Sequence, residues 1–282
     1  MEWETKRFSE ELRIRGYSPR TVESYARAVD LLLRWSRRHP RQLDMEEVRR
    51  YLVYLKDQGL SPSTINQAVC AARIFFLRIL ERPWDPVRIG CHRRPRKLPV
   101  VLTRDEVARA IEAARGLRSR TLLMTLYSTA VRVSELTNLQ VRDIDSASKR
   151  VHIRSGKGAK DRFAPLSERL LDQLRSYWRA HRPRHWLFPG PQKQHPIGQR
   201  SVQRICNRAG WCAGLQKRVT PHVFRHSCAT HLLESGVPLP YIQQILGHSS
   251  IKTTLIYTRV TPKALSEVVS PLDRLSLGPL DS

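Results

Sequence analysis

Apolar residues recur at helical spacing through about the first 80 residues of the chain. This periodicity predicts four amphipathic helices, because positions three and four apart share one face of a helix. Ser18–Pro19 and Ser61–Pro62 begin two of them, since a serine hydroxyl caps the first turn and proline is suited to the first helical position. Asp44 begins another, and Gly16 ends the first. The pattern predicts a compact four-helix domain over residues 1–82.

The helical periodicity stops between Pro83 and Pro99, where four prolines stand among basic residues. A segment of this composition cannot form a core of its own, so it predicts an extended linker over residues 83–99. The pair Cys91–His92 has no second pair nearby, which argues against a metal site. The basic side chains of the linker are Arg88, Arg93, Arg94, Arg96 and Lys97.

A capping box at Thr103 and Glu106 begins a second domain, residues 100–282. Three short runs of alternating apolar residues predict an antiparallel sheet, and a glycine-rich turn joins the last two runs into a hairpin. The fold class is therefore mainly α with a small antiparallel β-sheet. The runs cover residues 141–145, 149–154 and 162–166. The expected helices cover residues 104–115, 119–128, 167–180 and 199–210, with a further short helix near Arg132.

Residues 220–257 predict three consecutive short helices. Thr220–Pro221 begins the first helix with a hydroxyl cap and a proline in the first turn. The second ends at Gly247, and Ser249 or Ser250 can cap the third, near whose end Tyr257 is expected. Together the three helices carry two imidazoles, a guanidinium and a phenol, on His222, Arg225, His248 and Tyr257.

Composition narrows the class of partner. The chain has 50 Lys+Arg against 25 Asp+Glu, a formal net charge of +25, and a pI near 10.9. A basic excess of this size predicts a polyanion as partner, with nucleic acid first. Five scattered cysteines without a C-x-x-C pair indicate reduced thiols in a cytoplasmic protein. No apolar run is long enough to span a membrane, and the N-terminus lacks the layout of a secretory signal.

The residue types suit chemistry on a phosphodiester. A covalent nucleophile allows a DNA strand to be transferred instead of hydrolysed, and the phenol of Tyr257 is the candidate. A pentacoordinate phosphorus carries extra negative charge, which guanidinium groups match with paired hydrogen bonds. Arg132 and Arg225 are therefore expected to hold the two non-bridging oxygens and to stabilise the transition state.

The remaining polar groups of the set suit proton transfer. Lys157, at the tip of the predicted hairpin between two glycines, is the expected proton donor to the departing 5′ oxygen. His222 can accept the proton of the phenol, and His248 can donate a hydrogen bond to a non-bridging oxygen. Because side chains supply the positive charge, we expect no metal and no nucleotide cofactor.

The motifs in their order resemble those of the tyrosine recombinases, most closely the Xer-type recombinases and the integrases of phages and mobile elements. The matching stretches are Arg132 in T-A-V-R-V-S-E-L, Lys157 in G-K-G-A-K, His222-x-x-Arg225, His248 in L-G-H and Tyr257 in Y-T-R-V. The resemblance also implies a supporting role for Glu135. One departure is Ala130, where the family usually has glycine, and this change could shift Arg132.

The resemblance implies an N-terminal SAM-like domain that binds the DNA core site and a catalytic domain, which together form a C-shaped clamp. It implies site-specific recombination of double-stranded DNA through a 3′-phosphotyrosine intermediate and a Holliday junction. Four protomers are expected to assemble on two DNA sites, with a second, different recombinase as a possible partner. The linker residues Arg93, Arg94, Arg96 and Lys97 are expected to contact DNA.

The tail after Tyr257 predicts a helix from Thr261 with apolar Leu265, Val268 and Val269. We expect it to dock on a neighbouring protomer, the alternative being that it folds back on its own domain.

Three other interpretations compete. A relative that only binds DNA would not need the full catalytic set, and an enzyme similar to type IB topoisomerases would relax a supercoiled plasmid that lacks a cognate site. His222, His226 and Cys228 imitate a zinc-binding helix, but a cation at Arg225 opposes a metal there. We therefore expect His226 and His231 to be structural.

Binding to DNA is predicted to weaken steeply with salt, with a slope of about −0.9 per phosphate contact in log–log form. Reversal of Arg93, Arg94 and Arg96 to glutamate should weaken binding to every sequence alike, because phosphate contacts carry no sequence information. Titrations of cognate and unrelated duplexes at several salt concentrations measure both effects. A loss confined to one sequence would show that the linker reads bases.

Overall fold

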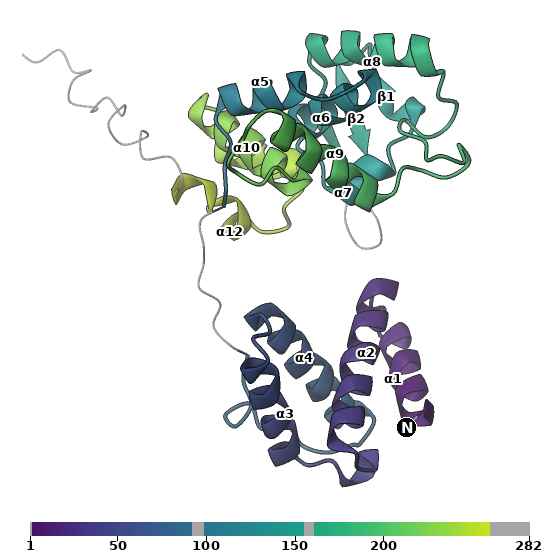
Figure 1. The fold of residues 1–282 in the computed structure, drawn as a ribbon, viewed down its shortest axis with the longest axis vertical. Coiled ribbons are helices and arrows are strands. Elements are labelled where there is room, and N and C mark those ends of the chain that lie inside the picture. Colours follow the sequence, from purple (N-terminus) through teal and green to yellow (C-terminus); the bar gives the residue numbers. More distant parts are fainter. Residues whose placement is uncertain (1, 92–98, 155–160, 260–282) are drawn as a thin grey trace, which may run out of the picture. The chain divides into compact units, whose positions relative to one another are not determined.

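The computed structural model describes residues 2–91, 99–154 and 161–259. The chain divides into two compact units, Met1–Arg96 and Lys97–Ser282 (Figure 1). The predicted linker, residues 83–99, spans this division, and its bounds remain a prediction. Its expected DNA contacts Arg93, Arg94, Arg96 and Lys97 lie outside the described residues, as does the predicted tail helix.

The N-terminal unit contains the four predicted helices. The hydroxyls of Ser18 and Ser61 and the carboxylate of Asp44 each accept a hydrogen bond from the backbone N–H three residues later, at 3.2, 3.2 and 2.7 Å. The predicted capping residues are thereby confirmed. The helices are α1 (Glu2–Ile14), α2 (Pro19–Ser36), α3 (Met45–Asp57) and α4 (Pro62–Arg78), with a short 3-10 helix at Pro40–Gln42.

One apolar core joins these four helices. Phe8 of α1 meets Phe75 of α4 edge to face, with ring centroids 5.6 Å apart. Both rings are fully buried. Ile89, which follows the helices, is also buried in this core, and Trp84 packs against it. The packed part of this unit therefore continues past the end of α4.

The second unit is mainly helical, as predicted. Its helix α6 contacts α5, α7, α8 and α10 and forms the centre of the packing. The helices are α5 (Arg104–Glu112), α6 (Leu117–Thr129), α7 (Val133–Thr137), α8 (Glu168–His181), α9 (Gln199–Cys212), α10 (Pro221–Glu234), α11 (Leu239–Leu246) and α12 (Ile251–Thr254), with 3-10 turns at Val141–Asp143 and Tyr257–Arg259.

The predicted three-stranded sheet is present, in the order β1-β2-β3 with both pairs antiparallel. Its strands are β1 (Ile144–Asp145), β2 (Arg150–Ile153) and β3 (Arg162–Pro165). Val151 lies opposite Ala164 and Ile153 opposite Arg162, all four on the buried face. The first strand is shorter than predicted, because the Asp143 carboxylate accepts a hydrogen bond from the Gln140 N–H at 2.8 Å and closes a 3-10 turn instead. Lys157 lies outside the described residues.

Two helix bounds in this unit differ from the prediction for a local reason. Helix α5 ends at Glu112, and α6 begins at Leu117, two residues earlier than expected. Gly116 precedes α6 with a φ of 79°, a conformation that glycine adopts without strain. Gly116 therefore fixes the position of the turn between α5 and α6. Among the described residues, no helix is both long and apolar enough to cross a membrane.

Candidate active site

The site is built from four places in the second unit that lie far apart in the sequence. Arg132 and Glu135 come from the N-terminal end of α7, His222 and Arg225 from the first turns of α10, His248 from the residue after Gly247, and Tyr257 from the final 3-10 turn. Ser250 caps α12, as expected, and Tyr257 lies near the end of this helix: α12 ends at Thr254, and Tyr257 begins the 3-10 turn that follows.

A buried carboxylate organises the arginines. Glu135 accepts hydrogen bonds from the Arg132 N–H at 2.7 Å and from Arg132 Nη1 at 2.8 Å. Arg162 of β3 donates to both oxygens of the same carboxylate, at 2.9 and 2.8 Å. Arg162 also donates from Nε to the Ile245 carbonyl at 2.8 Å. Glu135 therefore ties α7 to β3 and, through Arg162, to α11.

The Glu135 carboxyl is held in its charged form. Burial raises its pKa, but the hydrogen bonds from Arg162 and Arg132 outweigh burial and lower the pKa to about 2. A permanent negative charge is thus fixed beneath Arg132. The resemblance implies a supporting role for Glu135, and a charged carboxylate that holds Arg132 in place fits this role.

Arg225 is positioned by backbone carbonyls instead. Its Nη1 donates to Ala130 O at 2.6 Å and its Nη2 to Leu246 O at 2.5 Å. The side chain is only 2% exposed. Arg132 Nη2 donates to the next carbonyl, that of Gly247, at 3.1 Å. The C-terminal end of α11 therefore holds both guanidinium groups, and each keeps N–H donors for another acceptor.

Ala130 has a left-handed backbone, with φ 50° and ψ 30°. Its methyl group is fully buried, and its carbonyl is the one that accepts from Arg225. A left-handed residue costs about 1–2 kcal/mol unless it is glycine. The left-handed conformation directs this carbonyl toward Arg225. Glycine suits the position because it adopts that conformation without strain.

The hydroxyl of Tyr257 forms a hydrogen bond with His226 Nδ1 at 2.9 Å. Tyr257 is 1% exposed and packs in a small apolar cluster with Ala130, Cys228 and Leu246. Burial raises the pKa of the Tyr257 phenol, while the charge of Arg225 acts in the opposite direction. The phenol therefore needs a proton acceptor, and His226 Nδ1 contacts its hydroxyl.

Burial favours the neutral form of the histidines of the site. Burial, followed by neighbouring positive charges, lowers the pKa of His226 and of His248 to about 4. Burial and the charges of Arg225 and Arg132 also lower the pKa of His222. The His222 ring meets His226 edge to face at 4.1 Å, and His248 Nδ1 pairs with Thr254 Oγ1 at 2.9 Å.

The structure adds two residues that sequence reasoning missed. Arg162 lies on the buried face of β3, and strand alternation could have indicated that an arginine there needs a buried acid. His226 was expected to be structural, yet it lies one turn after His222 on the same helix face, which was a usable signal. His231, in contrast, pairs with Tyr127 at 2.8 Å away from this site.

Among residues 2–91, 99–154 and 161–259, no group of three or more His, Cys, Asp or Glu side chains could hold a metal ion. Arg132, Arg162 and Arg225 give the cluster three positive charges against the one negative charge of Glu135. The arrangement is therefore suited to an anion that carries up to two negative charges, next to a tyrosine hydroxyl.

Residues 100–264 match the Phage integrase family, and residues 5–86 match the family described as Phage integrase, N-terminal SAM-like domain. The chain belongs to the phage integrase family. It is 40% identical to the y4qK protein of Sinorhizobium fredii, an integrase/recombinase by its name, over 96% of the chain and 88% of that protein. It is 36% identical to the tyrosine recombinase XerA of Thermococcus kodakarensis, over 92% of the chain and 91% of that protein.

The fold of this phage integrase family member is also similar to solved structures. A crystal structure of the XerH site-specific recombinase bound to a palindromic difH substrate matches with a TM-score of 0.75 at 23% identity, over 92% of this chain and 83% of that chain. The expected family and fold class are confirmed. The chain is a tyrosine recombinase of the Xer and integrase type, an enzyme of site-specific DNA recombination.

Substitution of Ala130 tests the backbone requirement. Ala130→Gly should change the free energy of unfolding by less than about 1 kcal/mol, because relief of left-handed strain opposes the loss of a buried methyl group and the extra freedom of unfolded glycine. Ala130→Val should destabilise by more than about 2 kcal/mol, since a β-branched residue fits this conformation poorly, and should slow DNA cleavage by displacing the carbonyl that holds Arg225. Urea denaturation and a cleavage assay measure the two effects. Equal behaviour of both variants would refute the backbone explanation.

Proposed function

We propose that this recombinase binds double-stranded DNA and cleaves one strand at a time through Tyr257. The phenol oxygen attacks the phosphorus, the bond to the 5′ oxygen breaks, and a 3′-phosphotyrosine link forms. Attack by the 5′ hydroxyl of a partner strand reverses the step and passes through a Holliday junction. The observation that carries this proposal is that the Tyr257 hydroxyl forms a hydrogen bond with His226 and lies within the field of the Arg225 and Arg132 charges.

Charge balance supports the proposed chemistry. The three guanidinium groups and the Glu135 carboxylate leave two positive charges in excess. Attack of a phenolate on a phosphodiester gives a pentacoordinate phosphorus with two negative charges. The site is thus matched to the transition state better than to the singly charged substrate, which is the condition for rate acceleration.

We assign the groups as follows. Arg132 and Arg225 bind the non-bridging oxygens through their remaining N–H donors, and Glu135 orients Arg132. His248 donates a hydrogen bond to one of these oxygens. Lys157, which lies outside the described residues, protonates the departing 5′ oxygen. We propose His226 as the acceptor of the Tyr257 proton, and His222 supports it through ring contact.

Assembly and location are further parts of the proposal. We propose that the two units act as a clamp on duplex DNA, with the four-helix unit, which matches the N-terminal SAM-like domain, on the core site. Exchange between two duplexes needs four nucleophiles, so we propose a tetramer, two protomers on each site. The tail after residue 259 is proposed to dock on a neighbouring protomer. We place the protein in the cytoplasm, where chromosomal and mobile-element DNA is accessible in bacteria and archaea.

Tyr257→Phe should abolish the covalent adduct, because it removes the attacking oxygen and keeps the buried ring. A suicide substrate nicked near the cleavage point traps the adduct of the wild-type protein, and denaturing gels detect it. Tyr241→Phe is the matched control, since Tyr241 is 61% exposed and lies on α11. Both variants should bind the substrate with wild-type affinity. An adduct in Tyr257→Phe, or one that maps to Tyr241, would disprove the assignment.

His226→Ala should slow adduct formation by about 10²-fold or more, the usual contribution of a positioned proton acceptor. His226→Asn keeps a hydrogen-bond acceptor near Nδ1 but cannot take up the proton, so it should remain about as slow as His226→Ala. In the wild-type protein, the rate should fall as the pH drops through about 4, where His226 becomes protonated, and this inflection should be absent in the Asn variant.

The control for His226 is His231→Ala, because His231 is on the same helix and also pairs with a tyrosine hydroxyl. It should lower stability and leave the rate of adduct formation unchanged. A wild-type rate in His226→Ala would rule out the proposed role and would leave His222 as the proton acceptor.

A further inference from the structure

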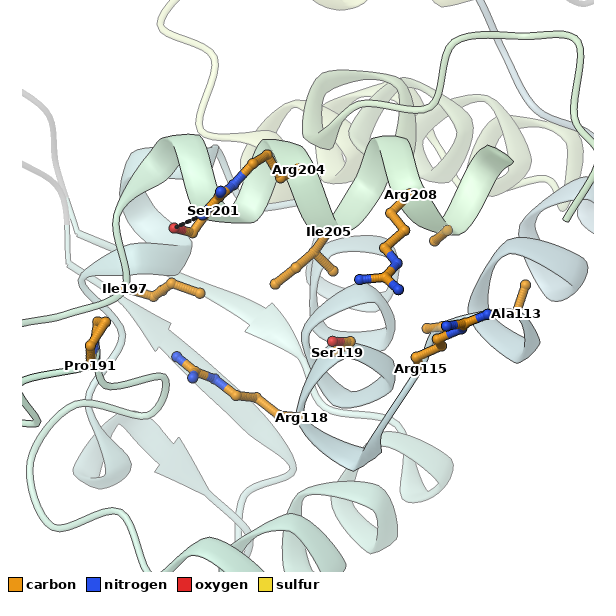
Figure 2. A pocket seen from close by; sticks show the side chains of 12 residues that line it. Ala113, Arg115, Arg118, Ser119, Pro191, Ile197, Ser201, Arg204, Ile205 and Arg208 are labelled. Atoms are coloured by element: carbon orange, nitrogen blue, oxygen red, sulfur yellow. Dashed lines mark hydrogen bonds between the residues drawn. The ribbon is translucent and has the colours of Figure 1, made fainter. Parts of the chain in front are cut away.

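A second concave site lies in the catalytic unit, at the end of α6 remote from Tyr257. The cavity has a volume of about 650 Å³, within the usual range of ligand pockets. It is formed by the turn between α5 and α6, the first turn of α6, the loop before α9 and one face of α9 (Figure 2). Ser201, Ile205 and Ala209 lie at helical spacing on that face of α9. The cavity has no part in the mechanism above.

Four arginines line this cavity: Arg115, Arg118, Arg204 and Arg208. In the part of the chain that the structure describes, none of them pairs with a carboxylate, and no acidic residue lines the cavity. In Figure 2, Arg208 extends from α9 toward α6, and Arg118 extends from α6 toward Pro191. Like charges gathered without a counterion destabilise one another, so an anion bound between them would be stabilising.

Two further groups at the cavity, Arg118 Nε and the N-terminal end of α6, also lack partners of opposite charge. Arg118 donates to the Pro189 carbonyl, but its Nε is buried and has no hydrogen-bond partner. Such a donor costs about 1–3 kcal/mol when it stays unpaired. The first turn of α6 has no side-chain cap and no acidic residue, so its partial positive charge is uncompensated. Ser119 lies on this turn between Arg118 and Arg208 (Figure 2).

Apart from the arginines and the two serines, Ser119 and Ser201, the lining is apolar. Ile197 and Ile205 form one wall, with alanines at positions 113, 114 and 209 around it. A bare inorganic anion would leave this apolar surface unfilled. A ligand that carries both a phosphate and a ring of nucleobase size would use both parts of the cavity.

We propose that this cavity is a binding site for the phosphate group of a nucleotide, with Arg118 and Arg208 as its main ligands. The source of this phosphate is a free mononucleotide; a nucleotide unit of the DNA substrate is the alternative that the experiment must exclude. Helix α6 separates the cavity from the catalytic site, because Leu117 and Ser119 are at one end and Ala130 follows the other. Its 13 residues give a length of about 20 Å. The cavity is therefore separated from the proposed catalytic residues by about the length of this helix.

Titration calorimetry with AMP at constant ionic strength tests the proposal. AMP should bind the wild-type protein with a Kd below about 1 mM, and uncharged adenosine should not bind measurably. Arg208→Gln should weaken AMP binding about tenfold or more, since it removes a charged hydrogen-bond donor. Arg179→Gln is the matched control, because Arg179 is an exposed arginine of α8 outside the cavity. It should leave the Kd of AMP unchanged.

A competition experiment distinguishes the two sources of phosphate. Simultaneous binding of AMP and duplex DNA to the wild-type protein would support a site for a free nucleotide, whereas displacement of AMP by duplex DNA would assign these arginines to the DNA substrate and would overturn the proposal. The absence of AMP binding, equal binding of adenosine, or an equal loss in Arg208→Gln and Arg179→Gln would overturn it. The melting temperature of each variant verifies folding. Because none of these readouts involves cleavage, failure here would leave the role of Tyr257 untouched.

Discussion

The buried ion pair between Glu135 and Arg162 is the interaction on which the rest of the site depends. Its two hydrogen bonds of 2.8 and 2.9 Å join α7 to β3. The same carboxylate fixes Arg132, and Arg162 fixes the end of α11 through the Ile245 carbonyl. Loss of one partner would leave a buried charge uncompensated, which is far more costly than loss of an exposed pair.

From this pair the geometry of the site follows in steps. The end of α11 presents the carbonyls of Leu246 and Gly247 to Arg225 and Arg132. Gly247 is in a left-handed conformation, and a side chain there would collide with Arg162, whose Cδ would lie 2.8 Å from an added Cβ. The ion pair and the glycine thus require each other. Arg225 in turn anchors the left-handed Ala130, so Arg132 and Arg225 are held from both sides.

Local features were predictable from the sequence, and features that depend on tertiary contacts were not. The caps at Ser18, Asp44 and Ser61 involve residues three apart, so a short motif contains all the information. The pairing of Arg162 with Glu135 joins residues 27 apart; strand alternation indicates that Arg162 needs a buried acid, but nothing in the sequence indicates that this acid is Glu135. The sequence did not predict that Tyr257 begins a separate 3-10 turn. Tyr257 packs in the apolar cluster with Leu246, and a local sequence pattern does not contain this tertiary contact.

His226 illustrates the same limit within the site. The sequence shows that residue 226 is a histidine on α10. Its proposed role depends on the side chain that contacts its Nδ1, and this side chain, Tyr257, lies 31 residues later in the chain. Motif order identified the family because five motifs in sequence are improbable by chance. The motifs could not assign the proton acceptor, because two neutral histidines one turn apart are chemically equivalent until their contacts are known.

The pH dependence of stability in Glu135→Gln tests the central ion pair most directly. A fall in the folded-state pKa of Glu135 from 4.5 to about 2 corresponds to about 3 kcal/mol of stability. The sign follows from the depressed pKa: this stability is complete above pH 4.5 and is lost as the pH falls toward 2. Urea denaturation should therefore show the variant less stable by about 3 kcal/mol at pH 7, with the difference shrinking between pH 4.5 and 2. A difference that is small at pH 7, or that does not change with pH, would contradict the account.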